Sequence, residues 1–302
     1  MFAAPPVIRT QVFAALPEAL RIRDRTCTRP GPYRDCFLEG PAFGRDGTLY
    51  CVDVAWGRIL RVSPEGRFDV VADYDGEPNG LAFHRDGRLF IADHARGLLV
   101  LDPASGIVST LLDRPHFQRF KGLNDLLFAS NGDLYFTDQG ESGLQDPAGC
   151  LYCLRADGRL DRLLDNIPSP NGLALTPDES VLLLAVTRAN AIWRVPLTLM
   201  PGGGITRVGL AVQLSGGTGP DGMAMGVDGS YAVAHIGLGC VWLFSSRGEP
   251  LARIESCAGA MISNVAYGGT DRRTLFMTES ESGSILTATL NVPGMRLFGD
   301  HS

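Results

Sequence analysis

The chain has 302 residues, and its 45% of hydrophobic residues favour a folded protein with a large core over a disordered chain. Its 27 basic and 33 acidic residues give a formal net charge of −6 without a basic cluster, which argues against nucleic acids and anionic membranes as partners. Glycine is in excess at 37 residues, which indicates many turns between short strands rather than a helical protein.

Three features bear on where the protein acts. Its longest apolar stretch, at about residues 181–186, is far shorter than the ~18 residues that a membrane-spanning helix needs. The N-terminal segment has no basic start, and two prolines and Arg9 interrupt its apolar region, which is unlike a signal peptide. Seven cysteines, an odd number, are typical of reduced thiols, so we expect a cytoplasmic protein.

The first candidate strand spans residues 11–16, QVFAAL. It precedes the repeated part of the chain and could pair as an outer strand with the last repeat, which would close a ring of sheets and cover their edges. The alternative is a solvated N-terminal tail.

Six similar units follow, beginning near residues 39, 78, 123, 170, 220 and 263. Each contains a short apolar strand, a turn such as Arg-Asp-Gly or Ser-Asn-Gly, a second strand, a glycine turn and a third strand. Their opening polar residues lie 40 to 50 positions apart, which is the length of a propeller blade. These residues are Glu39, Asn79, Asn124, Asn171, Asp221 and Asn264. The sequence therefore predicts an all-β fold, a six-bladed β-propeller that forms a single domain over residues 1–302.

The six opening residues carry only oxygen-donor side chains that suit a hard cation. First strands of a propeller run near its axis, so these side chains should surround one end of the central channel. Two carboxylates and four carboxamides suit Ca²⁺, Mg²⁺ or Mn²⁺. The alternative is that they serve only as turn residues, because Asn and Asp before Gly are common in turns.

A second ring of polar side chains is expected where the second strand of each unit returns to the same face. Counting 14 or 15 residues from each opening residue places Asp53, His94, Asp138, His235 and Glu279 there. His94 or His235 could act as a general base or bind a substrate oxygen. Alternatively, each histidine caps a strand end or binds backbone in the channel wall.

One further spacing, between Cys150 and Cys153 in the third unit, occurs in zinc and redox sites. No second cysteine pair or histidine pair completes such a site. We expect both cysteines to face one side of a strand.

Four motifs resemble those of a known family. They are FLEGPAF at 37–43, LND at 123–125, SPNGLAL at 169–175 and GPDGM at 219–223, and they resemble the SMP-30/gluconolactonase/LRE family. The resemblance implies a six-bladed propeller that hydrolyses sugar lactones, or related esters and phosphotriesters, with one divalent cation. It leaves the cation open among calcium, magnesium, manganese, zinc and iron.

Matched position by position, the resemblance implies roles for particular residues. Glu39, Asn171 and Asp221 would bind the cation, and Asn124 would lie beside it and contact the cation or the substrate. Asp221 is also the implied proton acceptor.

The resemblance also concerns the substrate side of the channel. Asn79 takes a channel position, and Glu141 matches a substrate-contacting acid. In the lactonases of this family that are most similar to its animal member, an arginine holds a sugar hydroxyl. This chain has Gly122 at that position. The adjacent Lys121 could supply a cation instead, with a different geometry. This departure leaves aldonolactone specificity open.

The leading hypothesis is a gluconolactonase-like, metal-dependent hydrolase that opens a small sugar-acid lactone. The cation would polarise the carbonyl, and water would attack with Asp221 as the base, helped by His94 or His235. No Gly-x-Ser-x-Gly motif supports a serine nucleophile. The alternatives are a non-catalytic, metal-stabilised propeller that binds a ligand or a protein, and a hydrolase of organophosphates or other esters. We expect a monomer or a small homo-oligomer.

Overall fold

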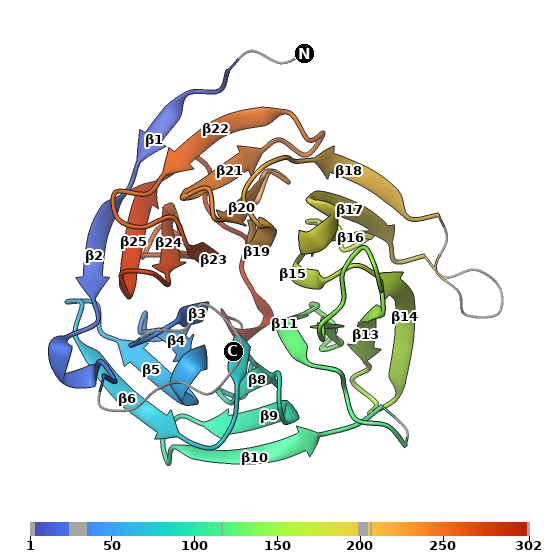
Figure 1. The fold of residues 1–302 in the computed structure, drawn as a ribbon, viewed down its shortest axis with the longest axis horizontal. Coiled ribbons are helices and arrows are strands. Elements are labelled where there is room, and N and C mark those ends of the chain that lie inside the picture. Colours follow the sequence, from blue (N-terminus) through green and yellow to red (C-terminus); the bar gives the residue numbers. More distant parts are fainter. Residues whose placement is uncertain (1–3, 24–34, 116, 199–204, 206, 301–302) are drawn as a thin grey trace.

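The chain forms six small sheets arranged in a ring around a central axis in the computed structural model (Figure 1). The structure describes residues 4–23, 35–115, 117–198, 205 and 207–300. The predicted all-β fold, a six-bladed β-propeller, is confirmed.

Blades 1 to 3 are four-stranded sheets in which successive strands pair antiparallel. Blade 1 contains β3 (Leu38–Phe43), β4 (Leu49–Asp53), β5 (Arg58–Val62) and β6 (Phe68–Asp73). Blade 2 contains β7 (Pro78–Phe83), β8 (Leu89–Asp93), β9 (Gly97–Asp102) and β10 (Ile107–Leu112). Blade 3 contains β11 (Leu123–Phe128), β12 (Leu134–Asp138), β13 (Gly149–Leu154) and β14 (Leu160–Ile167).

Blades 5 and 6 each take one outer strand from the N-terminal segment. Blade 4 contains β15 (Pro170–Leu175), β16 (Val181–Val186), β17 (Ala191–Pro196) and β18 (Gly209–Gln213). Blade 5 contains β19 (Gly219–Met225), β20 (Tyr231–Ile236), β21 (Cys240–Phe244) and β22 (Pro250–Glu255), with β1 (Val7–Arg9) parallel to β22. Blade 6 contains β23 (Ile262–Gly268), β24 (Thr274–Glu279) and β25 (Ser284–Thr289), with β2 (Gln11–Ala15) antiparallel to β25. Pairing between the two ends of the chain thus covers the outer edges of the last two blades.

Helical structure in the described residues is confined to short 3₁₀ turns. These are η1 (Glu18–Leu20), η2 (Val54–Trp56), η3 (Thr187–Ala189) and η4 (Phe298–Asp300). None of the helices in the described ranges has the length and apolar character needed to cross a membrane.

The position of a strand in its blade decides its burial. All five residues of β8 are buried, whereas every residue of the outer strand β10 is exposed or half-buried. The two faces of each blade pack against the two neighbouring blades, so the inner strands carry apolar side chains on both faces. Six clusters of apolar side chains fill the spaces between successive blades. The apolar core therefore forms a ring between the blades, and the first strands surround the axis inside it.

The turn between the first and second strands repeats from blade to blade. In blade 2 the carboxylate of Asp86 accepts a hydrogen bond from the backbone N–H of Arg88 at 3.0 Å, and Gly87 has a φ of +93°. A side chain is strained in that conformation, which explains the recurring glycine. In blade 4 Glu179 takes the equivalent place with a φ of +53°.

Cys150 and Cys153 both lie in β13, but they do not share a face as we predicted. Cys150 packs in the apolar cluster with side chains of blade 2, and Cys153 packs in the cluster with side chains of blade 4. Residues three apart in a strand point to opposite faces, because side chains alternate. Burial raises the pKa of the Cys153 thiol to about 12. Both cysteines therefore serve the core.

Candidate active site and metal centre

The first strands of the six blades contact one another in a closed ring, which gathers their opening residues around the axis. Of the predicted opening residues, Asn79 is half-buried. The five others are buried, namely Glu39, Asn124, Asn171, Asp221 and Asn264.

The register of blade 6 corrects its opening residue. Ile262 pairs with Glu279 and Asn264 pairs with Thr278, so Ser263 is the extra residue of a bulge. In blades 1 to 4 the opening residue directly follows the first paired residue of the sheet, and by the same count Ser263 takes the opening position in blade 6. Its hydroxyl donates to a backbone carbonyl of blade 1 at 2.9 Å. Asn264 therefore lies one residue further along the strand than we predicted.

The residues after the opening positions form a second layer around the axis. Four of them are glycines, Gly40, Gly80, Gly172 and Gly222, and the other two are Asp125 and Asn264. A Cβ at Gly80 would lie 2.6 Å from Oδ1 of Asp125, and one at Gly222 would overlap the amide of Asn264. The glycines leave the space that these two side chains occupy. We did not predict Asp125, although a carboxylate where four other units have glycine is a signal in the sequence.

Glu39, Asp125 and Asp221 form a cluster of buried carboxyl groups, with exposed fractions of 3%, 9% and 6%. Burial raises the pKa of Asp125 to about 6. Burial and the charge of Asp125 raise the pKa of Asp221 to about 8, although the side chains of Asn171 and Arg188 act in the opposite direction. Burial and the charges of Asp221 and Asp125 raise the pKa of Glu39 well above its ordinary value. Each group thus raises the cost of ionising a neighbour.

Within the described residues, no arginine or lysine forms an ion pair with this cluster. The amide of Asn264 donates to Oε2 of Glu39 at 3.0 Å and to Oδ2 of Asp125 at 3.5 Å. A buried group of carboxylates that lacks a positive partner fits a cation, which would offset the repulsion.

The donor set also limits how a cation could be held. No three His, Cys, Asp or Glu side chains surround a single metal position in the described part of the chain. A cation near Glu39 and Asp221 would therefore be held by two carboxylates together with the carboxamide oxygens of Asn171 and Asn124. Such oxygen donors suit calcium, magnesium or manganese.

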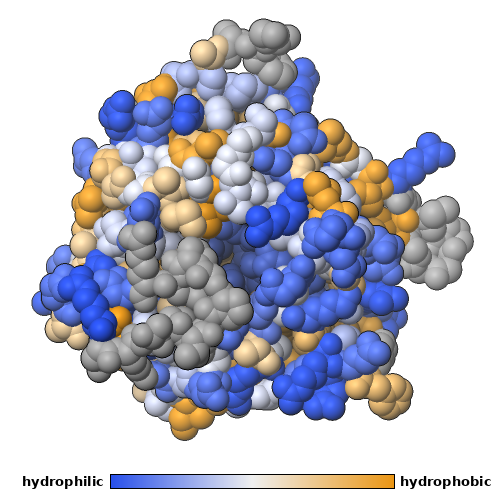
Figure 2. Space-filling model, viewed as in Figure 1, coloured by the Kyte–Doolittle hydropathy of each residue, from blue (hydrophilic) through white to orange (hydrophobic). Residues whose placement is uncertain are grey.

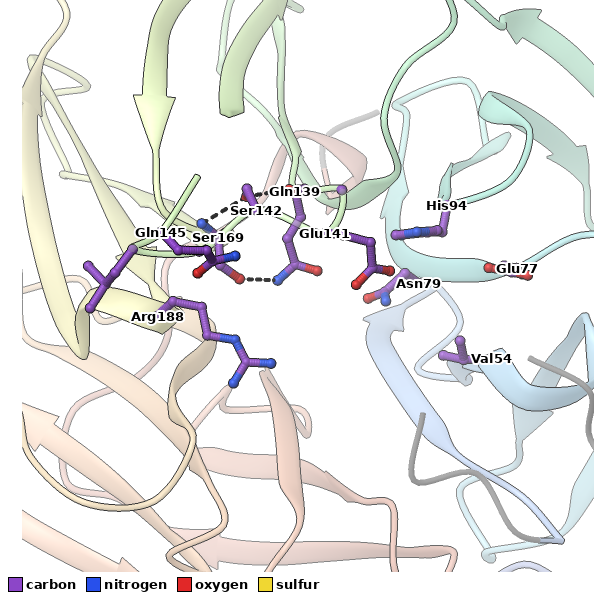
Figure 3. Close-up of a pocket in the computed structure, with 13 residues that line it drawn as sticks. Val54, Glu77, Asn79, His94, Gln139, Glu141, Ser142, Gln145, Ser169 and Arg188 are labelled. Carbon is purple, nitrogen blue, oxygen red and sulfur yellow. Dashed lines mark hydrogen bonds between the residues drawn. The ribbon is translucent and has the colours of Figure 1, made fainter. Parts of the chain in front are cut away.

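A polar cavity of about 610 Å³ opens beside this layer (Figure 3). Figure 2 shows a hollow near the middle of this face, bordered mainly by hydrophilic residues. Blades 1 to 4 and the loop after β12 supply its lining, which includes Asn79, His94, Gln139, Glu141 and Arg188. Its volume lies in the range of small-molecule sites.

Hydrogen bonds connect the buried layer with the cavity wall. The amide of Asn124 donates to Oε1 of Gln139 at 3.0 Å, and the Gln139 amide donates to the hydroxyl of Ser169 at 2.9 Å (Figure 3). The backbone N–H of Ser169 donates to the hydroxyl of Ser142 at 3.0 Å. These bonds hold the loop after β12 against the start of blade 4, and they orient Asn124.

The predicted substrate-side residues separate into two groups. Asn79 and Glu141 line the cavity and lie near each other in Figure 3. Lys121 is exposed, its ammonium group donates to the carbonyl oxygen of Ala148, and it is not part of the cavity lining. Lys121 therefore does not contribute a positive charge to the cavity lining.

His94 lines the cavity, but it does not belong to the second ring as we predicted. The register pairs Pro78 with Asp93, so Asp93 takes the ring position and His94 begins the following turn. A Cβ at Gly122 would lie 2.5 Å from Nδ1 of His94. The His94 ring thus packs in the space that a side chain at position 122 would need. The present placement of His94 therefore requires glycine at position 122.

Replacing Gly122 by alanine should therefore displace the His94 ring and lower stability. Gly87 offers a matched control, because it also has a positive φ but a Cβ there meets no atom within 4 Å. We expect Gly87→Ala to show only the backbone cost of about 1 kcal/mol, and Gly122→Ala to exceed it and to shift the imidazole NMR signals of His94. Urea unfolding and NMR of both variants measure this. Unchanged His94 signals in Gly122→Ala would contradict the packing.

His235 has a structural position rather than the catalytic one we predicted. Its side chain is fully buried, its Nε2 lies 2.9 Å from the carbonyl oxygen of Gly216, and its Nδ1 accepts from the indole N–H of Trp242 at 3.2 Å. Burial lowers its pKa. Both ring nitrogens are used and the ring does not line the cavity, so the placement of His235 matches the alternative, a histidine bound to backbone in the channel wall.

The carboxylates of the second ring have the same structural role. The carboxylate of Asp53 accepts from the backbone N–H of Phe37 at 2.9 Å, and the carboxylate of Asp138 accepts from the N–H of Lys121 at 2.9 Å. Each bond ties the end of a second strand to the segment that enters the first strand. The second ring therefore supports the opening residues and does not itself form the site.

Comparisons with known proteins agree with this architecture. The family model described as SMP-30/Gluconolactonase/LRE-like region matches residues 37–281. The lactonase drp35 of Staphylococcus aureus (strain MW2) is 30% identical over 231 residues, which cover 72% of this chain and 69% of that protein.

Solved structures share the fold at lower identity. The calcium-binding protein regucalcin from Agrobacterium tumefaciens superposes with a TM-score of 0.76 at 23% identity, covering 97% of this chain and 98% of that one. A gluconolactonase from Xanthomonas campestris superposes with a TM-score of 0.73 at 23% identity, covering 97% of each chain. By the extent of the family match and the identity to the lactonase, the chain belongs to the SMP-30/gluconolactonase/LRE-like family.

Proposed function

We propose that this protein is a lactonase that opens a sugar-acid lactone by hydrolysis with one divalent cation. The observation that carries the proposal is the buried carboxylate cluster of Glu39 and Asp221 beside a polar cavity of about 610 Å³. The names of the relatives support the same reaction, since drp35 is a lactonase and the Xanthomonas campestris protein is a gluconolactonase.

Glu39, Asp221, Asn171 and Asn124 would hold the cation. The calcium-binding regucalcin favours a divalent cation of this kind, and the choice among calcium, magnesium, manganese, zinc and iron belongs to experiment. When bound, the cation would polarise the lactone carbonyl and stabilise the oxyanion.

The other functional side chains would bind the substrate and move a proton. Asp221 accepts a proton from the attacking water at a carboxylate oxygen. His94, which lines the cavity, is the remaining histidine candidate for assisting that transfer. Asn79 and Glu141 supply hydrogen bonds to the hydroxyl groups of the sugar acid. We further propose a cytoplasmic monomer or small homo-oligomer, which the free cysteines of the described residues support.

Acid release from a panel of five- and six-carbon lactones tests the proposed function. The protein is first dialysed against EDTA and then reloaded with calcium, magnesium, manganese, zinc or ferrous ion. We expect turnover to disappear with EDTA and to return with at least one cation. An absence of turnover with the cation shown to be bound would favour a binding propeller. Turnover of phosphotriesters or simple esters alone would favour the other hydrolase.

A further inference from the structure

Arg188 is a charged residue of the cavity wall that the sequence did not single out. It lies in η3, directly after β16, and its guanidinium points into the cavity (Figure 3). Of the described residues that line the cavity, it is the single arginine or lysine, and the lining also includes Glu77 and Glu141. The cavity thus has one strong positive group on the blade 4 side.

The turn that carries Arg188 is fixed on both sides. Before it, the hydroxyl of Thr187 donates to the carbonyl oxygen of Pro220 at 2.8 Å, next to Asp221 in the chain. After it, the amide of Gln213 donates to the carbonyl oxygen of Ala189 at 3.1 Å, and Asn190 ends the turn in the left-handed conformation. The backbone of Arg188 is therefore held in place before any ligand binds.

The guanidinium of Arg188 has no hydrogen bond or ion pair with any described residue. Some other arginines of the fold are paired, as Arg58 is with Asp53 and Arg155 is with Asp133. Arg188 is exposed, and its positive charge acts to lower the pKa of Asp221. Its five N–H donors remain available to a ligand in the cavity.

A guanidinium with free donors recognises planar or tetrahedral anions, because its fork matches two oxygens of a carboxylate or a phosphate. In Figure 3, Glu141 and Asn79 lie across the cavity from Arg188. The two sides thus differ in charge: one suits the hydroxyl groups of a sugar, and the other suits an anion.

We propose that Arg188 binds an anionic substituent of the lactone, a carboxylate or a phosphate, and so selects charged sugar lactones over neutral ones. This inference rests on the proposed lactonase function. It goes beyond that function because it assigns the class of substrate and the residue that recognises its anionic substituent.

The test compares two lactones that differ in one group. Glucono-1,4-lactone has a hydroxymethyl group where glucaro-1,4-lactone has a carboxylate, and 6-phosphogluconolactone provides the phosphate arm. We expect the wild-type protein to prefer one of the charged lactones at least tenfold in kcat/KM. Arg188→Gln should lower kcat/KM for that lactone by about 10- to 100-fold and change it less than about threefold for the neutral one. Arg188→Lys should recover part of the loss, since it keeps the charge without the fork.

Arg194→Gln is the matched control, because Arg194 is exposed in the same blade and outside the cavity lining. It should leave both rates unchanged. Equal losses on charged and neutral lactones in Arg188→Gln would place Arg188 at the reacting carbonyl and overturn the proposal. Unchanged rates on all lactones would overturn it too.

Calorimetric binding of glucarate and gluconate separates this inference from the proposed function. Tighter binding of glucarate that Arg188→Gln abolishes would support anion recognition even if no lactone is hydrolysed. Equal binding of both acids in an active lactonase would overturn the role of Arg188 and leave the lactonase proposal standing.

Discussion

Replacing Asp221 by asparagine, or Glu39 by glutamine, should lower lactone turnover by at least about a thousandfold while the protein stays folded. Both substitutions keep the size of the side chain but remove a negative charge from the proposed cation site. In the metal-free protein they should raise stability by a few kcal/mol. The reason is that each unit by which folding raises a carboxyl pKa corresponds to about 1.4 kcal/mol of lost stability once the unfolded chain is ionised. The opposite signs of the two effects mark a functional site, since a structural carboxylate would lose stability when replaced.

Steady-state kinetics, metal content and urea unfolding of each variant measure this. Asp75→Asn is a suitable control, because Asp75 is exposed. This substitution should change neither the lactone turnover nor the stability. A variant of Glu39 or Asp221 that keeps full turnover would show that the cation site lies elsewhere. A loss of both turnover and stability would indicate a structural role instead.

The second large effect concerns the pH dependence of stability without metal. The folded protein holds protons on Asp125 up to about pH 6 and on Asp221 up to about pH 8, whereas the unfolded chain releases them near pH 4. The folded state therefore binds more protons in this range, and the free energy of unfolding should fall as the pH rises through it. The slope is at most about 1.4 kcal/mol per pH unit for each proton.

His235 contributes in the opposite direction, since its lowered pKa reduces stability at a pH below about 6.5. The interval from pH 6.5 to 8 therefore reports mainly on the buried carboxyl groups, Asp221 together with Glu39, whose pKa is also raised. A cation binds the ionised carboxylates, so its stabilising effect should grow across the same interval.

Urea unfolding at several pH values measures how stability depends on pH, with EDTA for the metal-free protein and with a saturating divalent cation for the loaded protein. Asp221→Asn should flatten the metal-free slope between pH 6.5 and 8. A metal-free protein that becomes more stable over that interval would contradict the carboxylate cluster, and so would a cation effect that does not change with pH.

The repeat made the fold predictable. Apolar runs of five or six residues, separated by Asp-Gly or Asn-Gly turns at a spacing of 40 to 50 residues, recur because each blade needs the same local geometry. The same periodicity predicted that Glu39, Asn171 and Asp221 occupy equivalent places, and the structure buries all three.

Errors of one residue arose in blades 2 and 6, where the exact register could not be read from the sequence. In blade 6 the opening position is held by Ser263, and taking a carboxylate or carboxamide as the mark of that position assigned it to Asn264 instead. In blade 2 the count reached His94 instead of Asp93. A one-residue shift exchanges the faces of a strand, and sequence spacing does not reveal where a bulge lies.

The sequence by itself thus determined the number of blades, the all-β fold and the carboxylates and carboxamides that open blades 1 to 5, because these depend on local patterns that repeat. The tertiary structure alone decided which of those groups meet. It placed Asp125 in the cluster, seated His94 against Gly122, fixed His235 to backbone and directed Arg188 into the cavity. These placements depend on contacts between residues of different blades or distant turns, and no local pattern records such contacts.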